Sequence, residues 1–175
     1  MGSHDGQEAM ASVTPPKLRA GDRVRLVSPA SYPDQASVEA CRAVLEAWGL
    51  RSEVAPHALD EWGYMAGSDT DRAEDLNDAF RDPGVRAIIT TRGGAGAYRI
   101  ADRLDVAAVR ADPKPLVGFS DITYLHLALL RQCRLGGIHG CLVGSTARAS
   151  VRQLLMTTDP IVLRRDLEAV SAGVE

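Results

Sequence analysis

The chain has 175 residues, of which 45% are apolar and 25% charged, so it is long enough for one compact domain and has the composition of an ordinary globular protein. Its net charge is −3 and its basic residues do not cluster, which argues against a nucleic-acid partner. Three cysteines without a CxxC pair favour neither a disulfide framework nor a metal site, and no window approaches 18 uninterrupted apolar residues. We expect a cytoplasmic protein with no metal, no cofactor and no membrane partner.

Residues 1–16 are polar and end in two prolines, so we expect a mobile arm there and a single domain over residues 17–175. Within the domain, short β-branched runs alternate with helical stretches, an order typical of parallel sheets with crossover helices. The expected fold class is therefore α/β, with a parallel sheet flanked by helices in a three-layer, flavodoxin-like or Rossmann-like arrangement.

The strands are predicted from β-branched runs, and the helices from apolar residues three and four positions apart. In the last helix, Leu129 and Leu130 are both expected to face the core. Residues 56–67 have no periodicity and are expected to form an ordered loop of functional importance. In chain order we expect a strand at 23–30, a helix at 35–48, a strand at 51–55, a helix at 69–80, a strand at 86–91, a helix reaching residue 104, a strand at 116–119, a helix at 121–131 and a strand at 137–139.

Ligands bind at the carboxyl ends of the strands in parallel sheets, and two loops with unusual sequences are expected there. The first is the glycine turn at residues 92–96 (RGGAG), which joins a strand to a helix, so its amides are placed to hold an anion or a developing oxyanion. The third glycine of a dinucleotide GxGxxG is replaced by Arg99, and no GK[ST] phosphate loop is present. A tight turn without a ligand remains the alternative.

The second loop follows the strand at residues 116–119 and turns at Ser120 directly into a helix, the context that a nucleophile elbow requires. Ile122 replaces the second glycine of GxSxG, and serine is also a common helix N-cap, so a capping role remains open. A serine nucleophile needs a base. His126 lies too far along the same helix, whereas His139 ends the next strand and could come close, although it lacks an orienting carboxylate and is expected in a core or supporting position.

Taken together and in this order, these motifs resemble the LD-carboxypeptidase family, serine peptidases that include muramoyltetrapeptide carboxypeptidase and the microcin C self-immunity proteins. The resemblance implies hydrolysis of a C-terminal amide bond in a small peptide, typically the bond between diaminopimelate and D-Ala in a cell-wall tetrapeptide. The segments that carry the resemblance are residues 18–29, 67–89, 92–96, 114–125 and 139–140.

The resemblance also implies roles for individual residues. Ser120 matches the nucleophile of the family. Gly93 and Gly94 match its glycine turn, which is expected to form the oxyanion hole together with the N–H group of Asp121. Two departures from the family pattern leave the exact substrate open between a murein peptide and a microcin-like compound: Ala95 and Phe119 stand where the family commonly has tyrosines.

The family completes a Ser-Glu-His triad with residues of a C-terminal domain that begins about where this sequence stops, near Glu175. We therefore expect the chain to be the nucleophile-bearing half of a two-domain enzyme, nearly inactive by itself, and the resemblance makes a homodimer plausible. Two alternatives remain open: a noncatalytic module of the same fold that binds a peptide or forms a dimer, and a nucleotide-binding α/β domain.

Overall fold

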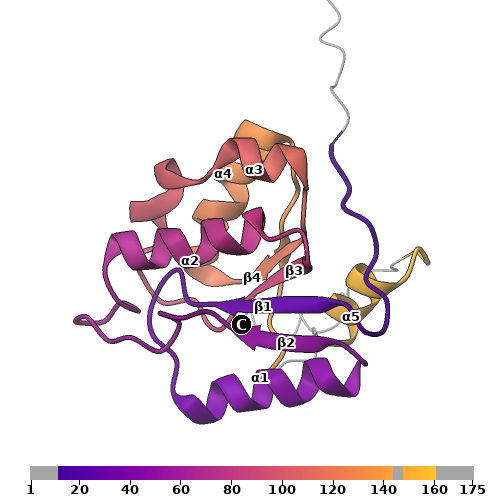
Figure 1. Cartoon of the computed structure of the whole chain (residues 1–175), viewed down its shortest axis with the longest axis horizontal. Helices are drawn as coiled ribbons and strands as arrows, with labels where there is room; N and C mark the ends of the chain where they lie inside the picture. Colours follow the sequence, from indigo (N-terminus) through magenta and orange to yellow (C-terminus); the bar gives the residue numbers. More distant parts are fainter. Residues whose placement is uncertain (1–11, 144–147, 161–175) are drawn as a thin grey trace, which may run out of the picture.

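The computed structural model describes residues 12–143 and 148–160 of the chain. One parallel sheet with the strand order β2-β1-β3-β4-β5 forms its centre, which confirms the expected α/β class (Figure 1). The carboxyl ends of all five strands meet at one edge of this sheet. The strands are β1 (Arg23–Val27), β2 (Arg51–Val54), β3 (Val85–Thr90), β4 (Leu116–Gly118) and β5 (Ile138–His139).

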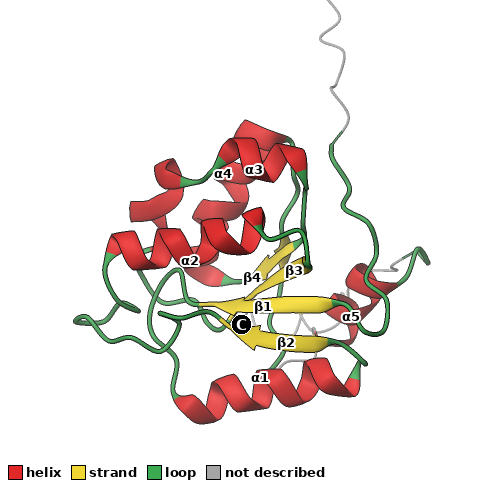
Figure 2. Cartoon of the chain, viewed as in Figure 1, coloured by secondary structure: helices red, strands yellow, loops and turns green. Residues whose placement is uncertain are grey.

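Helices cover both faces of the sheet (Figure 2). One face is packed by α1 and α5, and the other by α2, α3, α4 and the 3₁₀ helix η1, so two separate apolar clusters form the core. The helices are α1 (Gln35–Ala47), α2 (Asp69–Arg81), η1 (Ala97–Arg103), α3 (Val106–Ala111), the 3₁₀ turn η2 (Ser120–Ile122), α4 (Thr123–Cys133) and α5 (Arg148–Met156).

Three helices and the exposure of one leucine differ from the sequence-based expectation. Helices α3 and α5 were not predicted, and the expected helix after the glycine turn is a 3₁₀ helix. On α4, Leu129 is buried as expected but Leu130 is 43% exposed, so its predicted place in the core is wrong. Successive helical residues are about 100° apart around the axis, and α4 presents only one narrow face to the sheet.

The expected N-terminal arm touches the domain from residue 12 onward, whereas residues 1–11 lie outside the described residues. The Val13 N–H donates a hydrogen bond to the Arg134 carbonyl at 2.8 Å, and Val13 forms a parallel bridge with Leu135. None of the helices in residues 12–143 and 148–160 has the length and apolar character that crossing a bilayer requires.

The start of β4, which leads to Ser120, is fixed by the buried side chain of Lys114. This side chain is fully buried, and its ammonium group donates to the carbonyls of Ala79, Phe80 and Asp82. These acceptors lie at the C-terminal end of α2, where carbonyls lack partners within the helix. Burial lowers the pKa of the Lys114 ammonium. The contact holds α2 and β4 together just before the catalytic candidate.

Candidate active site

Ser120 occupies a strained turn at the carboxyl end of β4. Phe119 is extended, whereas Ser120 has a φ of +57° in the left-handed region, which is costly for a residue with a side chain. Ser120 is exposed at the edge of the sheet. A Cβ atom on Gly118 would lie 2.5 Å from Thr90 Oγ1, so glycine lets β4 run close to β3 just before the turn. The strand-turn-helix context expected of a nucleophile elbow is present.

The glycine turn lies directly against this serine. A Cβ atom on Gly93 would lie 2.9 Å from Ser120 Cβ and 3.0 Å from the Phe119 carbonyl oxygen. Gly94 has a φ of +114°, and a Cβ atom there would lie 2.2 Å from Ser31 Oγ. Both positions therefore require glycine for different steric reasons. The structure brings together the two loops that the sequence singled out.

Hydrogen bonds hold the glycine turn against the loop that follows β1 and against the serine turn. The Ser31 N–H donates to the Gly93 carbonyl at 3.3 Å, and Ser31 Oγ accepts from the Ala95 N–H at 3.2 Å. The Asp121 carboxylate accepts from the Ala97 N–H at 2.7 Å, which joins the serine turn to the start of η1. Asp121 therefore holds the two loops together through its side chain, besides the backbone role expected from the sequence.

Three main-chain N–H groups at this junction have no acceptor within the described part of the chain: those of Gly93, Gly94 and Asp121. Such groups are suited to hold a negatively charged oxygen that develops next to Ser120. These are the residues at which an oxyanion hole was expected. The arrangement can chemically support the addition of the serine hydroxyl to a carbonyl group.

Gly93→Ala should disrupt the site, because the new methyl group would overlap Ser120 Cβ and the Phe119 carbonyl. We expect a loss of roughly 1–3 kcal/mol in the free energy of unfolding, as is usual for overpacking. Gly136→Ala is the matched control, since a Cβ atom on Gly136 meets nothing within 4 Å. Urea unfolding of both variants measures the difference, and equal stabilities would contradict the close contact.

The buried side chain of Arg72 supports the glycine turn, and the sequence analysis did not identify this residue. Arg72 on α2 is 1% exposed and donates to the Pro29 carbonyl at 2.7 Å and to the Gly96 carbonyl at 3.0 Å. Its guanidinium also contacts Met65 Sδ at 3.3 Å and pairs with Asp69. Arg72 thereby ties the end of the glycine turn to the loop that follows β1. No spacing rule connects it with residues so far along the chain.

His139 lies beside the serine, as the sequence allowed, but it is exposed and does not belong to the core. Its Nε2 atom accepts a long hydrogen bond of 3.4 Å from the Ser120 main-chain N–H. Within residues 12–143 and 148–160, no side chain forms a hydrogen bond with the Ser120 hydroxyl. The described site therefore holds a candidate nucleophile and free N–H groups, with His139 in a supporting position. The same part of the chain contains no cluster of three residues suited to a metal.

His126 is a second histidine near this site. It belongs to α4, and its side chain is buried against the loop that precedes β5. A Cβ atom on Gly137 would lie 2.2 Å from His126 Cδ2, so the glycine allows the close packing. Burial, with a smaller effect from His139, lowers the pKa of His126 to about 4. Its Nε2 atom has no partner among the described residues. His126 is therefore neutral at physiological pH and faces away from solvent.

The depressed pKa of His126 predicts a loss of stability in mild acid. Unfolded chains protonate histidine near pH 6.5, whereas the folded protein resists protonation until about pH 4. The free energy of unfolding should therefore fall by up to roughly 3 kcal/mol from this group as the pH drops through that window. His126→Phe replaces the imidazole with an aromatic ring that cannot be protonated. Urea unfolding from pH 7.5 to 4.5 should show a shallower decline for the variant, and parallel curves would contradict the prediction.

Comparison with known proteins identifies the family of this chain. A family model described as the LD-carboxypeptidase N-terminal domain matches residues 24–140. A Streptomyces coelicolor protein with a provisional carboxypeptidase name is 46% identical over 132 residues, which cover 73% of this chain and 43% of that protein. A Bacillus subtilis protein named as a probable murein peptide carboxypeptidase is 34% identical over 154 residues, 83% of this chain and 48% of its own length.

A solved structure shows the same fold. The crystal structure of an MccF-like protein from Bacillus anthracis matches with a TM-score of 0.76 and 29% identity, over 82% of this chain and 47% of that chain. The present chain thus spans about half the length of the relatives it matches. On the family model and these identities, the chain belongs to the LD-carboxypeptidase family and carries its N-terminal domain.

Proposed function

We propose that this chain is the nucleophile-bearing part of a serine LD-carboxypeptidase, with Ser120 as the attacking residue. The observation that carries the proposal is the contact between the strained Ser120 turn and the glycine turn at Gly93, beside N–H groups that have no acceptor among the described residues. The substrate we propose is a murein tetrapeptide that ends in D-Ala, in keeping with the name of the Bacillus subtilis relative. The cysteines of the described residues are free, which fits the reducing cytoplasm as the place of action.

The proposed reaction proceeds in two halves. Ser120 Oγ forms a bond to the carbonyl carbon of the last amide, and its proton passes to a general base. The N–H groups of Gly93, Gly94 and Asp121 are available to stabilise the resulting oxyanion. The C–N bond then breaks, the amine of the leaving D-Ala takes up the proton, and the rest of the peptide remains as an ester on Ser120. Water hydrolyses this ester and restores the hydroxyl.

We propose that the general base comes from a further segment, since the family resemblance places a Glu and a His in a C-terminal domain. Within the described residues, His139 contacts the Ser120 amide and not its hydroxyl, which suits a supporting role. Without a base, most of the nucleophilic step is lost. The chain by itself should therefore turn over very little peptide. We also propose that two copies of this chain form a homodimer.

A chimera tests the proposed function. It joins this chain to the C-terminal part of the Streptomyces coelicolor relative, and circular dichroism first verifies that it is folded. We expect the chimera to release D-Ala from a tetrapeptide with an LD-linked end, whereas the chain alone and a tetrapeptide ending in L-Ala give little product by mass spectrometry. A folded chimera that binds the tetrapeptide without cleaving it would contradict the proposal and indicate a noncatalytic binding module.

A further inference from the structure

A cavity of about 200 Å³ opens at the carboxyl edge of the sheet next to the serine turn. Its walls come from segments that follow β1, β3, β4 and β5, and they include Phe119, the residue directly before Ser120. The volume is smaller than the ~300–1,000 Å³ of sites for drug-sized ligands, so the cavity suits a small group. Its lining mixes hydroxyl groups with apolar side chains: Ser37, Thr90, Thr91, Phe119 and Leu142.

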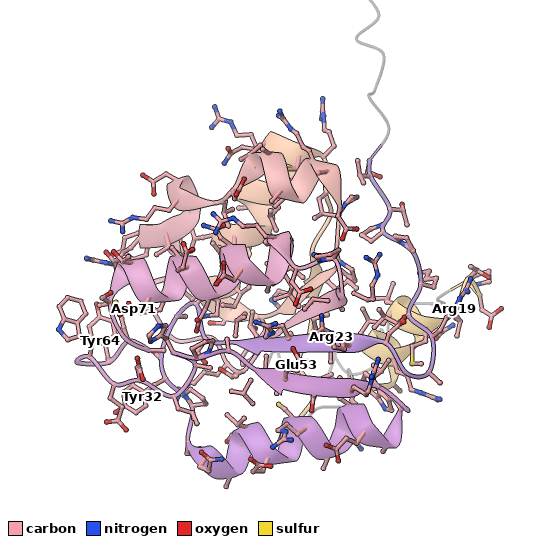
Figure 3. The ribbon with its side chains drawn as sticks, viewed as in Figure 1. Arg19, Arg23, Tyr32, Glu53, Tyr64 and Asp71 are labelled. Atoms are coloured by element: carbon pink, nitrogen blue, oxygen red, sulfur yellow. The ribbon has the colours of Figure 1, made fainter. Side chains whose placement is uncertain are left out.

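Arg92 supplies the positive charge of this cavity. One of its terminal nitrogens donates to the Tyr32 carbonyl at 3.2 Å, a contact just beyond the end of β1, where Figure 3 labels Tyr32. A guanidinium has five N–H donors in a planar fork, so this bond steadies the side chain and leaves most donors available. Arg92 is exposed and forms no ion pair with a carboxylate among the described residues, although Asp34 in the same cavity wall lies near enough to interact with it electrostatically.

The neighbouring charges at this edge are already engaged. Arg99 and Arg72 both pair with Asp69. Asp34, which lies in the cavity wall, accepts from the Ser37 N–H at 2.7 Å and from the Ser37 hydroxyl at 2.9 Å. The hydrogen bonds from Ser37 and the partial positive charge at the N-terminus of α1 stabilise the Asp34 carboxylate, which also interacts electrostatically with Arg92. Among the described residues that line the cavity, Arg92 is the one basic side chain, so an anion that enters the cavity would bind there.

We propose that this cavity receives the C-terminal residue of the substrate and that Arg92 binds its free carboxylate. The inference rests on the proposed function, because only a peptidase that removes a terminal residue needs such a partner. A small residue held between Arg92 and the cavity wall places the preceding amide bond beside Ser120, since Phe119 belongs to the same wall. A forked guanidinium recognises a carboxylate through two parallel hydrogen bonds, which explains why a chain end is selected over an internal bond.

The test compares a tetrapeptide acid with its C-terminal amide as substrates of the chimera. The unmodified enzyme should prefer the acid, and Arg92→Gln should lower kcat/KM for the acid roughly 10- to 100-fold, mainly through KM, with little change for the amide. Arg92→Lys should retain an intermediate preference. Arg131→Gln, an exposed position near the far end of α4, should behave like the unmodified enzyme. Equal losses on both substrates, or no loss at all, would overturn the role of Arg92.

A second measurement uses the chain alone and does not depend on turnover. Titration with N-acetyl-D-alanine should shift the NMR signals of Thr91 and of the Arg92 side chain, whereas N-acetyl-D-alaninamide should not. The shifts should disappear in Arg92→Gln. A chimera without hydrolysis but with these shifts would refute the proposed function and leave the carboxylate site standing. Shifts that are identical for the acid and the amide would refute the carboxylate site.

Discussion

Replacing Ser120 with alanine should lower D-Ala release by the chimera by roughly four to six orders of magnitude, the scale seen when a serine nucleophile is removed from a triad. The physical reason is that the Ser120 side chain is exposed, sits on a turn with a positive φ and lies directly against the glycine turn. Steady-state assays with the tetrapeptide measure the loss. Ser52→Ala, a change at the opposite end of the sheet on β2, should leave turnover within twofold of the unmodified enzyme.

The same position should show a trade-off between stability and activity. Ser120 holds a φ of +57°, which alanine tolerates no better than serine but glycine adopts freely. Ser120→Gly should therefore be inactive like Ser120→Ala, yet more stable than it by about 1 kcal/mol in urea unfolding. Turnover retained in either variant would exclude Ser120 as the nucleophile, and a less stable Ser120→Gly would show that the turn is not strained.

Arg72→Met should cause the largest loss of stability, about 3–5 kcal/mol in the free energy of unfolding. Methionine fills much of the space but leaves the Pro29 and Gly96 carbonyls buried without their donor. Asp69 keeps its pair with Arg99, so the cost comes mainly from the two carbonyls and the glycine turn they belong to. Urea unfolding of the chain alone measures the effect.

Arg42→Met provides the matched control for the buried arginine. Arg42 pairs with Glu39 on the surface of α1, with both side chains substantially exposed, so its removal should cost less than about 1 kcal/mol. Should Arg72→Met fail to fold, Arg72→Lys should still fold with an intermediate loss, because an ammonium reaches some of the acceptors. Similar stabilities of the Arg42 and Arg72 variants would contradict the supporting role of Arg72.

The layered fold could be predicted because alternation of β-branched runs and amphipathic helices is a local property of the chain. The expected strand at residues 86–91, for example, is observed at Val85–Thr90. Helix α3 escaped prediction because its six residues make fewer than two turns, too few for a periodic pattern. The exposure of Leu130 depends on how closely α4 approaches the sheet, which only tertiary packing decides.

The functional site, like the fold, could be predicted only in part from the sequence. Ser120 and the glycine turn each have a local signature, a strand that ends in a sharp turn, and both were found from the sequence. Their mutual contact depends on the neighbouring positions of β3 and β4 in the sheet. The supporting residues Ser31 and Arg72 act through main-chain groups of distant loops, so no motif marks them.

Covalent trapping tests the central claim most directly. The chimera is incubated with a peptidyl fluorophosphonate that mimics the tetrapeptide, and the modified residue is mapped by mass spectrometry. We expect a single adduct on Ser120, absent from Ser120→Ala and strongly reduced in Gly93→Ala. A chimera that hydrolyses the tetrapeptide but carries its adduct on any other residue would contradict the account.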